Sequence, residues 1–372
     1  MYNHLYMKFE ATKDRFIKAF SKVEKISNKG SSNPILKSVL LETKNSSLVM
    51  RATNLDVGIE VTMPIKLEEA GTIAVPASIL GNFVAGLDKE KIFTFEKVDE
   101  VLRVSAEHSS ASLKLYAHEE FPLIPRIESE KSFTIPSREF VKGLQSVVYS
   151  ASLSSIKPEL SSVYIYPDGE NLVFVATDSF RLAEKKVKIK EKLDFEHILI
   201  PYKNVADIVR ILEEKEEVIT ISFDKNQISF TGEDFYLVSR VVDATFPAYK
   251  QIIPKESSTE VVLLKQDFLN ALKVSRVFSD SFNRITLVIS PKEKTFYIST
   301  KNSDIGENTT GLSASLKGEA LQISFNYKNL FDCFQSINSD SVLLSFDGLS
   351  KPLILKGVGD TSFFYLAMPM NK

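Results

Sequence analysis

The sequence has little of what metal, redox and membrane sites are built from. A single cysteine, Cys333, excludes an intramolecular disulfide and any CxxC motif, so we expect a protein of the reducing cytoplasm. The four histidines lie far apart without an HExxH or HxH pattern, which speaks against a zinc site. No stretch approaches ~18 uninterrupted apolar residues, and residues 1–10 hold no apolar segment of signal-peptide length. We expect no metal, no cofactor, no secretion and no membrane span.

Common catalytic signatures are missing too. The chain contains no GxxxxGK[ST], no GxGxxG after a predicted strand and no GxSxG, so no catalytic residue is predicted. The net charge is −2, from 46 basic and 48 acidic residues, which is not the footprint of a protein that simply coats nucleic acid. A role on DNA would therefore require its basic residues to be segregated onto one surface.

What the sequence does contain is a globular composition. Hydrophobic residues make up 44% and charged residues 25%, with only 14 glycines and 14 prolines among 372 residues. This composition is unlike that of disordered or collagen-like chains. At ~150 residues per domain, the length predicts two or three domains.

The chain repeats itself at a nearly constant step. The segments IAVPASIL, ILIPYKNV and ISFNYKNL begin at residues 73, 198 and 323, which are 125 residues apart. A second phrase, RATN, VATD and ISTK, recurs at residues 51, 175 and 298, and FPLIP at 121–125 returns in longer form as FPAYKQIIP at 246–254. Because internal repeats of this kind mark repeated structural units, we predict three similar domains over residues 1–130, 131–255 and 256–372.

Each repeat carries the same pattern of predicted elements. Apolar residues at helical spacing, such as Phe16, Phe20 and Val23, predict an early helix, and the 125-step phrase predicts a strand that runs into a second helix. The same early helix is expected from Phe140 to Val148 and from Phe268 to Val277, with first-turn acids at its start. Alternating strands such as 162–166 and 171–175 surround a Pro-Asp-Gly turn. The prediction is an α+β fold with two helices on antiparallel sheet in every domain.

Five segments read together resemble a known family. They are MKFE at 7–10, NPIL at 33–36, VATDSFRLA at 175–183, FPAY at 246–249 with IP at 253–254, and MPM at 368–370. In this order, and with a threefold repeat, they resemble the bacterial DNA sliding clamp, the beta subunit of DNA polymerase III. The resemblance covers the chain from Met7 onward.

The resemblance implies a clamp fold of three tandem domains, two copies of which form a head-to-tail dimeric ring around double-stranded DNA. Such a protein is a processivity factor and not an enzyme, because it holds the polymerase on its template by topology. The implied partners are DNA, contacted independently of sequence, the polymerase III alpha subunit, the clamp loader, other polymerases and repair proteins, and a second copy of the chain. A basic lining and an acidic outer face would cancel to a near-neutral net charge.

Basic residues on helices and loops are the candidates for contact with DNA. The candidate set is Lys29, Lys157, Lys203, Lys273, Arg276, Arg284 and Lys328. Lys328 is the repeat equivalent of Lys203, 125 residues later. Each is also readily explained as an ordinary solvated side chain, so the hypothesis concerns the set more than any member.

For partner proteins, the resemblance implies a hydrophobic cleft between the second and third domains that accepts short linear peptides. By residue matching it would be lined by Leu160, Thr177, Ser179, Phe180, Arg181, Leu182, Pro247, Gln251, Ile252, Leu366, Met368, Pro369 and Met370. The apolar end of the chain supports this independently, because a terminus of that composition must dock or be docked upon. Ser179, Phe180 and Gln251 depart from the family's usual residues, so the peptide preference is expected to differ.

Two other hypotheses remain open from sequence alone. One is an α+β repeat enzyme with Asp178 and Arg181 in an active site between domains, although no nucleophile or cofactor loop accompanies them. The other is a peptide-binding scaffold that forms no ring and has no role on DNA. For the dimer contact, Val277 and Phe278 are the candidates.

Overall fold

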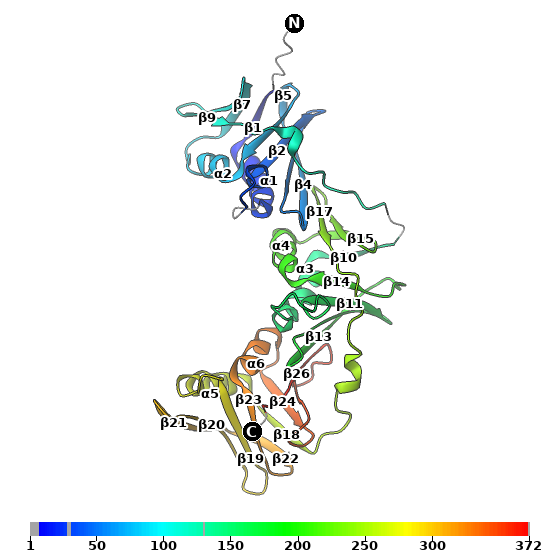
Figure 1. Ribbon diagram of the computed structural model, residues 1–372, viewed down its shortest axis with the longest axis vertical. Coiled ribbons are helices and arrows are strands. Elements are labelled where there is room, and N and C mark those ends of the chain that lie inside the picture. Colours follow the sequence, from blue (N-terminus) through cyan, green and yellow to red (C-terminus); the bar gives the residue numbers. More distant parts are fainter. Residues whose placement is uncertain (1–6, 28–30, 129–130, 371–372) are drawn as a thin grey trace. The chain divides into compact units, whose positions relative to one another are not determined.

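The computed structural model describes residues 7–27, 31–128 and 131–370, and the chain folds into two compact units. Unit 1 consists of Met1–Arg138 and Ala206–Val241, and unit 2 of Glu139–Val205 and Val242–Lys372. Figure 1 shows helices and antiparallel strands alternating along the chain. The α+β class is therefore confirmed.

The described residues form six α-helices, two in each predicted domain. These are α1 Lys13–Ile26, α2 Ala77–Ala85, α3 Ser137–Gln145, α4 Tyr202–Leu212, α5 Lys265–Val277 and α6 Tyr327–Phe331. Five short 3₁₀ helices join them: η1 Pro34–Lys37, η2 His118–Glu120, η3 Val148–Ser150, η4 Tyr249–Ile252 and η5 Asp332–Ser336. No helix in the described part of the chain is long and apolar enough to cross a membrane.

Unit 1 contains two antiparallel sheets. The first has the order β5-β1-β7-β8-β9, and the second has the order β10-β15-β16-β17-β4-β3-β2-β6. The strands of the first sheet are β1 Lys8–Thr12, β5 Lys66–Glu69, β7 Ile92–Val98, β8 Val101–Ser105 and β9 Ser110–Lys114. Those of the second are β2 Ser38–Lys44, β3 Ser47–Thr53, β4 Val57–Pro64, β6 Thr72–Pro76, β10 Ser132–Pro136, β15 Val218–Phe223, β16 Gln227–Thr231 and β17 Phe235–Arg240.

Unit 2 is built in the same way. Its larger sheet has the order β14-β11-β12-β13-β26-β25-β24-β18-β22, and its smaller sheet has the order β21-β20-β19-β23. The strands of the larger sheet are β11 Ser162–Asp168, β12 Asn171–Thr177, β13 Arg181–Lys188, β14 Ile198–Pro201, β18 Thr259–Leu264, β22 Ala314–Gly318, β24 Ser341–Phe346, β25 Leu353–Gly357 and β26 Phe363–Ala367. Those of the smaller sheet are β19 Arg284–Ser290, β20 Thr295–Asn302, β21 Gly306–Gly311 and β23 Leu321–Asn326.

Each large sheet joins two successive repeats by one strand pair. In unit 1, β17 of the second repeat pairs antiparallel with β4 of the first, with Leu237 opposite Ile59. In unit 2, β26 of the third repeat pairs with β13 of the second, with Tyr365 opposite Ala183. Backbone hydrogen bonds of a continuous sheet thus connect the repeats, and the two connections use equivalent strands.

The core of each repeat lies between its helices and its strands. In the first repeat, the ring of Phe16 on α1 lies 4.7 Å from that of Phe95, which stacks on Phe9 at 4.6 Å. In the third, Phe268 on α5 occupies the position of Phe16 and meets Phe296. All five of these residues are at most 1% exposed, so the apolar spacing read from the sequence does face the cores.

One detail of the predicted helices is wrong. The helix expected to reach Val148 ends at Gln145, and Val148 lies in η3. The Ser146 N–H still donates to the carbonyl of Lys142 in the α-helical pattern, but the N–H of Val147 donates to the carbonyl of Leu144, an i→i−3 bond with which the α-helix gives way to η3. The first-turn acids are present as predicted, with Asp14 in α1 and Asp267 in α5, and Thr12 and Leu264 precede these helices without a side-chain cap.

Candidate peptide-binding cleft and basic surface

The candidate cleft begins with a tight loop between β12 and β13. The Thr177 hydroxyl donates to the carbonyl of Arg181 at 2.6 Å and accepts from the backbone N–H of Ser179. Asp178 Oδ1 accepts from the N–H groups of Phe180 and Arg181. These bonds hold Ser179 at a φ of 78° and leave the Phe180 side chain 66% exposed. The loop therefore presents an aromatic ring to solvent on a fixed backbone.

The floor next to this loop is one apolar cluster. Leu182 and Leu366, on the paired strands β13 and β26, pack with Phe246 and Tyr249 of the segment that follows β17, and Met368 lies partly buried against them. These side chains belong to one surface although they are far apart in the sequence. The predicted cleft residues Leu182, Leu366 and Met368 are thus brought together.

The end of the chain forms one wall. The N–H of Met368 donates to the carbonyl of Phe180 at 2.8 Å, and the N–H of Met370 donates to that of Ser324 on β23. Met368, Pro369 and Met370 remain partly exposed. The apolar terminus is therefore docked, as the sequence predicted, while part of its surface stays open to solvent.

The remaining predicted cleft residues fall into two groups. Pro247, Gln251 and Ile252 are exposed on and before η4, whose Tyr249 packs in the apolar cluster, and Ile252 is 51% exposed. Leu160 is buried in the turn before β11, and it does not belong to the apolar cluster of the floor. The structure gives Leu160 a packing role in that turn.

Arg181 and Asp178 hold the loop in place. The guanidinium of Arg181 lies 3.0 Å from Asp178 Oδ2 and 2.6 Å from Asp332 Oδ2, and its side chain is only 14% exposed. Both residues proposed for an alternative active site are thus engaged in fixing the loop and in joining it to η5. Sequence reasoning missed Asp332, because its sequence separation from Arg181 gave no signal of the pairing.

A buried polar group fastens η4 to the sheet. The Tyr249 hydroxyl donates to Glu184 Oε2 at 2.5 Å and lies 2.8 Å from the Tyr166 hydroxyl. Burial raises the pKa of Tyr249 far above its ordinary range, and the Glu184 carboxylate adds to this shift. Lys250 lies over the Tyr166 ring at 5.1 Å. These residues were not predicted, although the alternation of Tyr164 and Tyr166 marks an aromatic face of β11.

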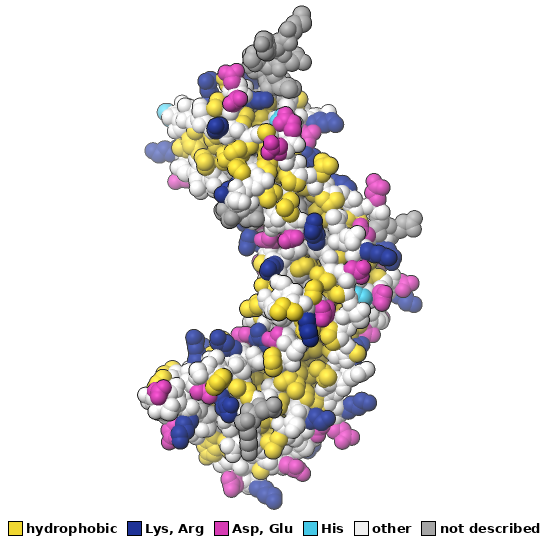
Figure 2. Space-filling model, in the orientation of Figure 1, with side chains coloured by type: hydrophobic (Ala, Val, Ile, Leu, Met, Phe, Trp, Pro, Cys, Tyr) yellow, Lys and Arg dark blue, Asp and Glu magenta, His cyan; other side chains and the backbone are white. Residues whose placement is uncertain are grey.

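The candidate DNA contacts lie mainly on helices. Lys203 is exposed near the start of α4, Lys273 and Arg276 are exposed on α5, and Lys328 is exposed on α6. Arg276 lies 6.0 Å from the centre of the Tyr327 ring. Figure 2 shows Lys and Arg side chains gathered where Figure 1 places α5 and α6.

The other three candidates differ. Lys157 is exposed in a turn before β11. Arg284, at the start of β19, has its Nε 3.9 Å from Asp280 Oδ2, so that carboxylate already partly neutralises it. Lys29 lies outside the described residues.

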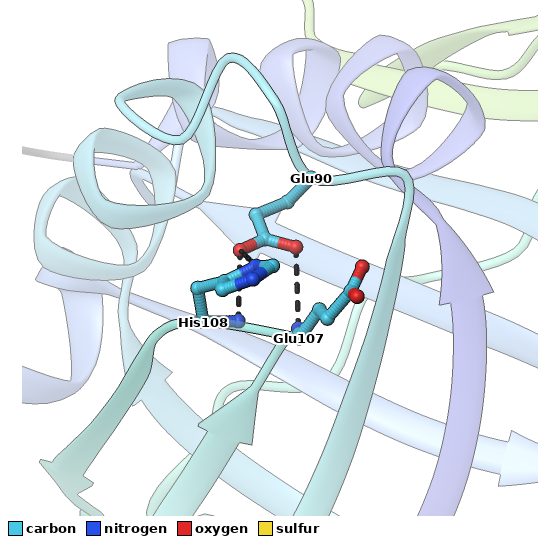
Figure 3. A group of neighbouring side chains, drawn as sticks. All are labelled: Glu90, Glu107 and His108. Atoms are coloured by element: carbon cyan, nitrogen blue, oxygen red, sulfur yellow. Dashed lines mark hydrogen bonds and ion pairs between the residues drawn. The ribbon is translucent and has the colours of Figure 1, made fainter.

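Within the described residues, one cluster of possible metal-ligating groups is present, at Glu90, Glu107 and His108 (Figure 3). The nearly buried Glu90 carboxylate accepts from the backbone N–H groups of Glu107 and His108, at 3.2 and 3.0 Å. The imidazole of His108 lies beside it, with Nδ1 3.6 Å from Oε1, and is mostly exposed. These bonds fix the turn between β8 and β9, and we assign Glu90 that structural role.

Comparison with known proteins gives a consistent result along the whole chain. Family models of the DNA polymerase III beta subunit match its N-terminal domain at residues 7–125, its central domain at 134–248 and its C-terminal domain at 250–371. The beta sliding clamp of Synechococcus elongatus is 26% identical over 91% of this chain and 92% of its own length. That of Halalkalibacterium halodurans is 25% identical over 98% of this chain and 100% of its own length.

Solved structures share the fold. The DNA polymerase sliding clamp of Bacillus subtilis has a TM-score of 0.93 at 24% identity and covers 99% of this chain and 100% of its own. The DNA polymerase III beta subunit of Thermotoga maritima has a TM-score of 0.92 at 24% identity, over 98% of this chain and 100% of its own. The chain therefore belongs to the DNA polymerase III beta subunit family of bacterial sliding clamps, and its role is that of a non-catalytic processivity factor in DNA replication.

Proposed function

We propose that two copies of this chain close head to tail into a ring around double-stranded DNA, and that the ring tethers the replicative polymerase. The observation that carries the proposal is the repeated strand junction. In both units the fourth strand of one repeat pairs with the last strand of the next, as β4 with β17 and β13 with β26. If the third repeat follows the same rule, its fourth strand must pair with the last strand of a further repeat, and a second copy of the chain can supply that strand.

The strands for that junction are the open edges of the two smaller sheets. β21 is the fourth strand of the third repeat and ends its sheet, and β9 is the last strand of the first repeat and ends its own. The described chain pairs neither edge further, so the rule supports pairing of β21 with β9 of a second copy. Two such contacts related by one rotation close a ring.

The surfaces beside both edges are suited to burial. On α5, next to β21, Val274 and Val277 are 46% and 63% exposed, and Ile79 on α2, next to β9, is 59% exposed. Exposed apolar side chains grouped beside an open edge favour association. Val277 and Phe278, which forms the C-cap of α5, remain our candidates for the dimer contact.

We infer that the cleft of unit 2 receives linear peptides of the polymerase alpha subunit, the clamp loader, other polymerases and repair proteins. Its fixed loop, apolar floor and docked terminus support this. The thirteen residues predicted from sequence remain the proposed lining, with Leu160 in a supporting position. A large apolar side chain buried on Leu182 and Leu366 would contribute roughly 1.5–3 kcal/mol before ordering costs.

Removing one wall tests the cleft. Deletion of residues 368–372 takes away Met368, Pro369 and Met370, so the affinity for a labelled peptide from the polymerase's C-terminal tail should fall by about tenfold or more. Sedimentation should still give a dimer of twice 41.8 kDa, because the proposed dimer edges lie elsewhere. Equal affinities of the two proteins would refute this placement of the cleft.

We also propose that Lys157, Lys203, Lys273, Arg276, Arg284 and Lys328, with Lys29, contribute to the DNA-facing surface, and that the protein acts in the cytoplasm. Contact with phosphates independent of base sequence suits a protein that must slide. The domain limits of 1–130, 131–255 and 256–372 remain predictions, which limited proteolysis of the purified chain can check.

A further inference from the structure

Unit 1 contains a second copy of the loop that begins the cleft. In residues 53–57 the Thr53 hydroxyl donates to the carbonyl of Val57 at 2.9 Å and accepts from the N–H of Leu55 at 3.0 Å. Asn54 Oδ1 accepts from the N–H groups of Asp56 and Val57, and Leu55 has a φ of 78°. These are the bonds and the left-handed residue found in residues 177–181, at the equivalent positions of the next repeat.

The last strand of the next repeat is held to the loop in the same way in both units. The N–H of Arg240, at the end of β17, donates to the carbonyl of Asp56 at 2.9 Å. In unit 2 the N–H of Met368, just after β26, donates to the carbonyl of Phe180 at 2.8 Å. The segment at 121–125 supplies a third side, as its longer repeat at 246–254 does in unit 2. The frame of a cleft is therefore present in unit 1.

This frame encloses an open groove of about 260 Å³. A cavity of roughly 150 Å³ is enough to hold a benzene ring, so a large apolar side chain fits. Leu55 and Leu123 both line the groove and are 54% and 96% exposed, so two apolar side chains are open to a partner there.

Two features of the sequence shape this groove. Gly58 stands where unit 2 has Leu182, and a Cβ there would lie only 3.1 Å from Ile124 Cγ2, so the glycine lets Ile124 pack on β4 as part of the floor. Pro122 and Pro125 restrict the backbone of the wall on either side of Leu123. The groove thus combines an apolar floor with a stiff rim.

The charges at the groove indicate what would bind there. Arg240 is exposed at the end of β17 and offers its guanidinium to a carboxylate of a partner, and the exposed carboxylate of Asp56 is the other charged group of the lining. We propose that this groove in unit 1 is a second docking site, which takes a short linear peptide of a partner protein with one large apolar side chain beside an acidic residue. The inference rests on the proposed function in that it assigns the same class of ligand to both loops.

Photo-crosslinking of the full-length protein tests the proposal. The probe is the peptide acetyl-Ser-Bpa-Asp-Ser-amide, in which Bpa is benzoylphenylalanine, and mass spectrometry locates the crosslinks. We expect saturable crosslinks to residues 53–58 or 121–125. Leu55→Asp and Leu123→Asp place a carboxylate at the groove and should each lower this yield about tenfold or more. Leu55→Asp is compatible with the local backbone, because Asp tolerates a positive φ.

Val218→Asp is the matched control, since Val218 is 65% exposed in unit 1 and does not line the groove. Its yield should equal that of the wild type. Arg240→Glu should lower the yield in unit 1 and leave that in unit 2 unchanged. Deletion of residues 368–372 should leave the unit 1 crosslinks unchanged, which separates this inference from the proposed cleft. Crosslinks in unit 2 alone, or unit 1 crosslinks that survive Leu55→Asp and Leu123→Asp, would overturn the proposal.

Discussion

At the scale of single residues, a partly buried ion pair joins the first repeat to the second. Lys22 on α1 is 1% exposed, and its ammonium group lies 3.0 Å from Asp234 Oδ1 and 5.4 Å from the centre of the Phe235 ring. Asp234 itself is 36% exposed. Loss of the carboxylate would therefore cost more stability than loss of the ammonium group, because only the lysine has lost its access to water.

This asymmetry predicts unequal effects of substitution. Asp234→Ala leaves a buried ammonium without its carboxylate and should lower the free energy of unfolding by about 2 kcal/mol, below the ~3–5 kcal/mol of a fully buried pair. Lys22→Met keeps the apolar stem and leaves only a solvated carboxylate, so it should cost less than about 1 kcal/mol. Urea unfolding of both variants checks this, and a larger loss in Lys22→Met would contradict it.

The buried Lys185 should make the stability of the fold depend on pH. The residue is 4% exposed on β13, and its Nζ donates to the Ser362 hydroxyl at 2.6 Å. Burial lowers the pKa of Lys185 below its ordinary value of 10.5, and the charge of Lys142 lowers it further, while Asp360 and Glu139 oppose the shift. The folded state therefore binds this proton less well than the unfolded state, so this group's contribution to stability rises with pH from the lowered pKa up to 10.5.

Replacement of Lys185 by methionine removes that penalty. Lys185→Met should therefore be more stable than the wild type near neutral pH, and the difference should shrink as the pH approaches 10.5. Urea midpoints of the two proteins near pH 7 and near pH 10 measure it. A difference that does not change with pH would show that the charge of Lys185 is not the cause.

At the scale of elements, open sheet edges are expected to assemble the ring. An exposed edge such as β21 is a liability unless another strand covers it. Val277→Asp places a carboxylate in the apolar surface beside this edge, so it should raise the dimer dissociation constant about tenfold or more. Sedimentation across a dilution series measures this constant, with Val218→Asp as the control. An unchanged dimer would place the contact elsewhere.

The sequence predicted elements better than their ends. The 125-residue repeat placed every strand-to-helix phrase, because the same apolar residues must face the same core in each repeat. It could not show that α3 ends at Gln145, since the change from an i→i−4 bond at Ser146 to an i→i−3 bond at Val147 leaves no mark in the apolar spacing. The sequence also could not explain why residue 143, inside α3, is a glycine. In the fold a Cβ there would lie 2.4 Å from the Phe174 ring, so any larger residue would clash.

The site was predictable to the extent that it repeats or is apolar. VATD at 175–178 and the apolar terminus marked the loop and wall of the cleft, because both stand out in the sequence. Asp332 and Glu184 were not predicted, since their partners Arg181 and Tyr249 become neighbours only when distant strands pair. The groove at 53–57 had its signal in the repeat of RATN, but its shape depends on Gly58 and on the segment that covers it.

At the scale of the whole molecule, the account depends on how basic and acidic residues are distributed over the surface. A net charge of −2 gives no general attraction to DNA, so the exposed Lys203, Lys273 and Arg276 must act locally. Their triple replacement by glutamine should weaken DNA binding equally for all sequences, and should reduce the slope of log affinity against log salt by up to about 3. Replacement of the exposed Lys188, Lys190 and Lys192 is the matched control and should change neither quantity. Unchanged binding of the first variant would refute the assignment.

The central claim is that the protein holds DNA by enclosing it. The most direct measurement is retention of the loaded protein on a nicked circular DNA in a salt concentration that screens its phosphate contacts. A closed ring should stay on the circle through the salt wash and leave as soon as the circle is cut into a linear molecule, because only then does an end pass through it. Release from the intact circle in salt, or retention on the linear DNA, would contradict the account.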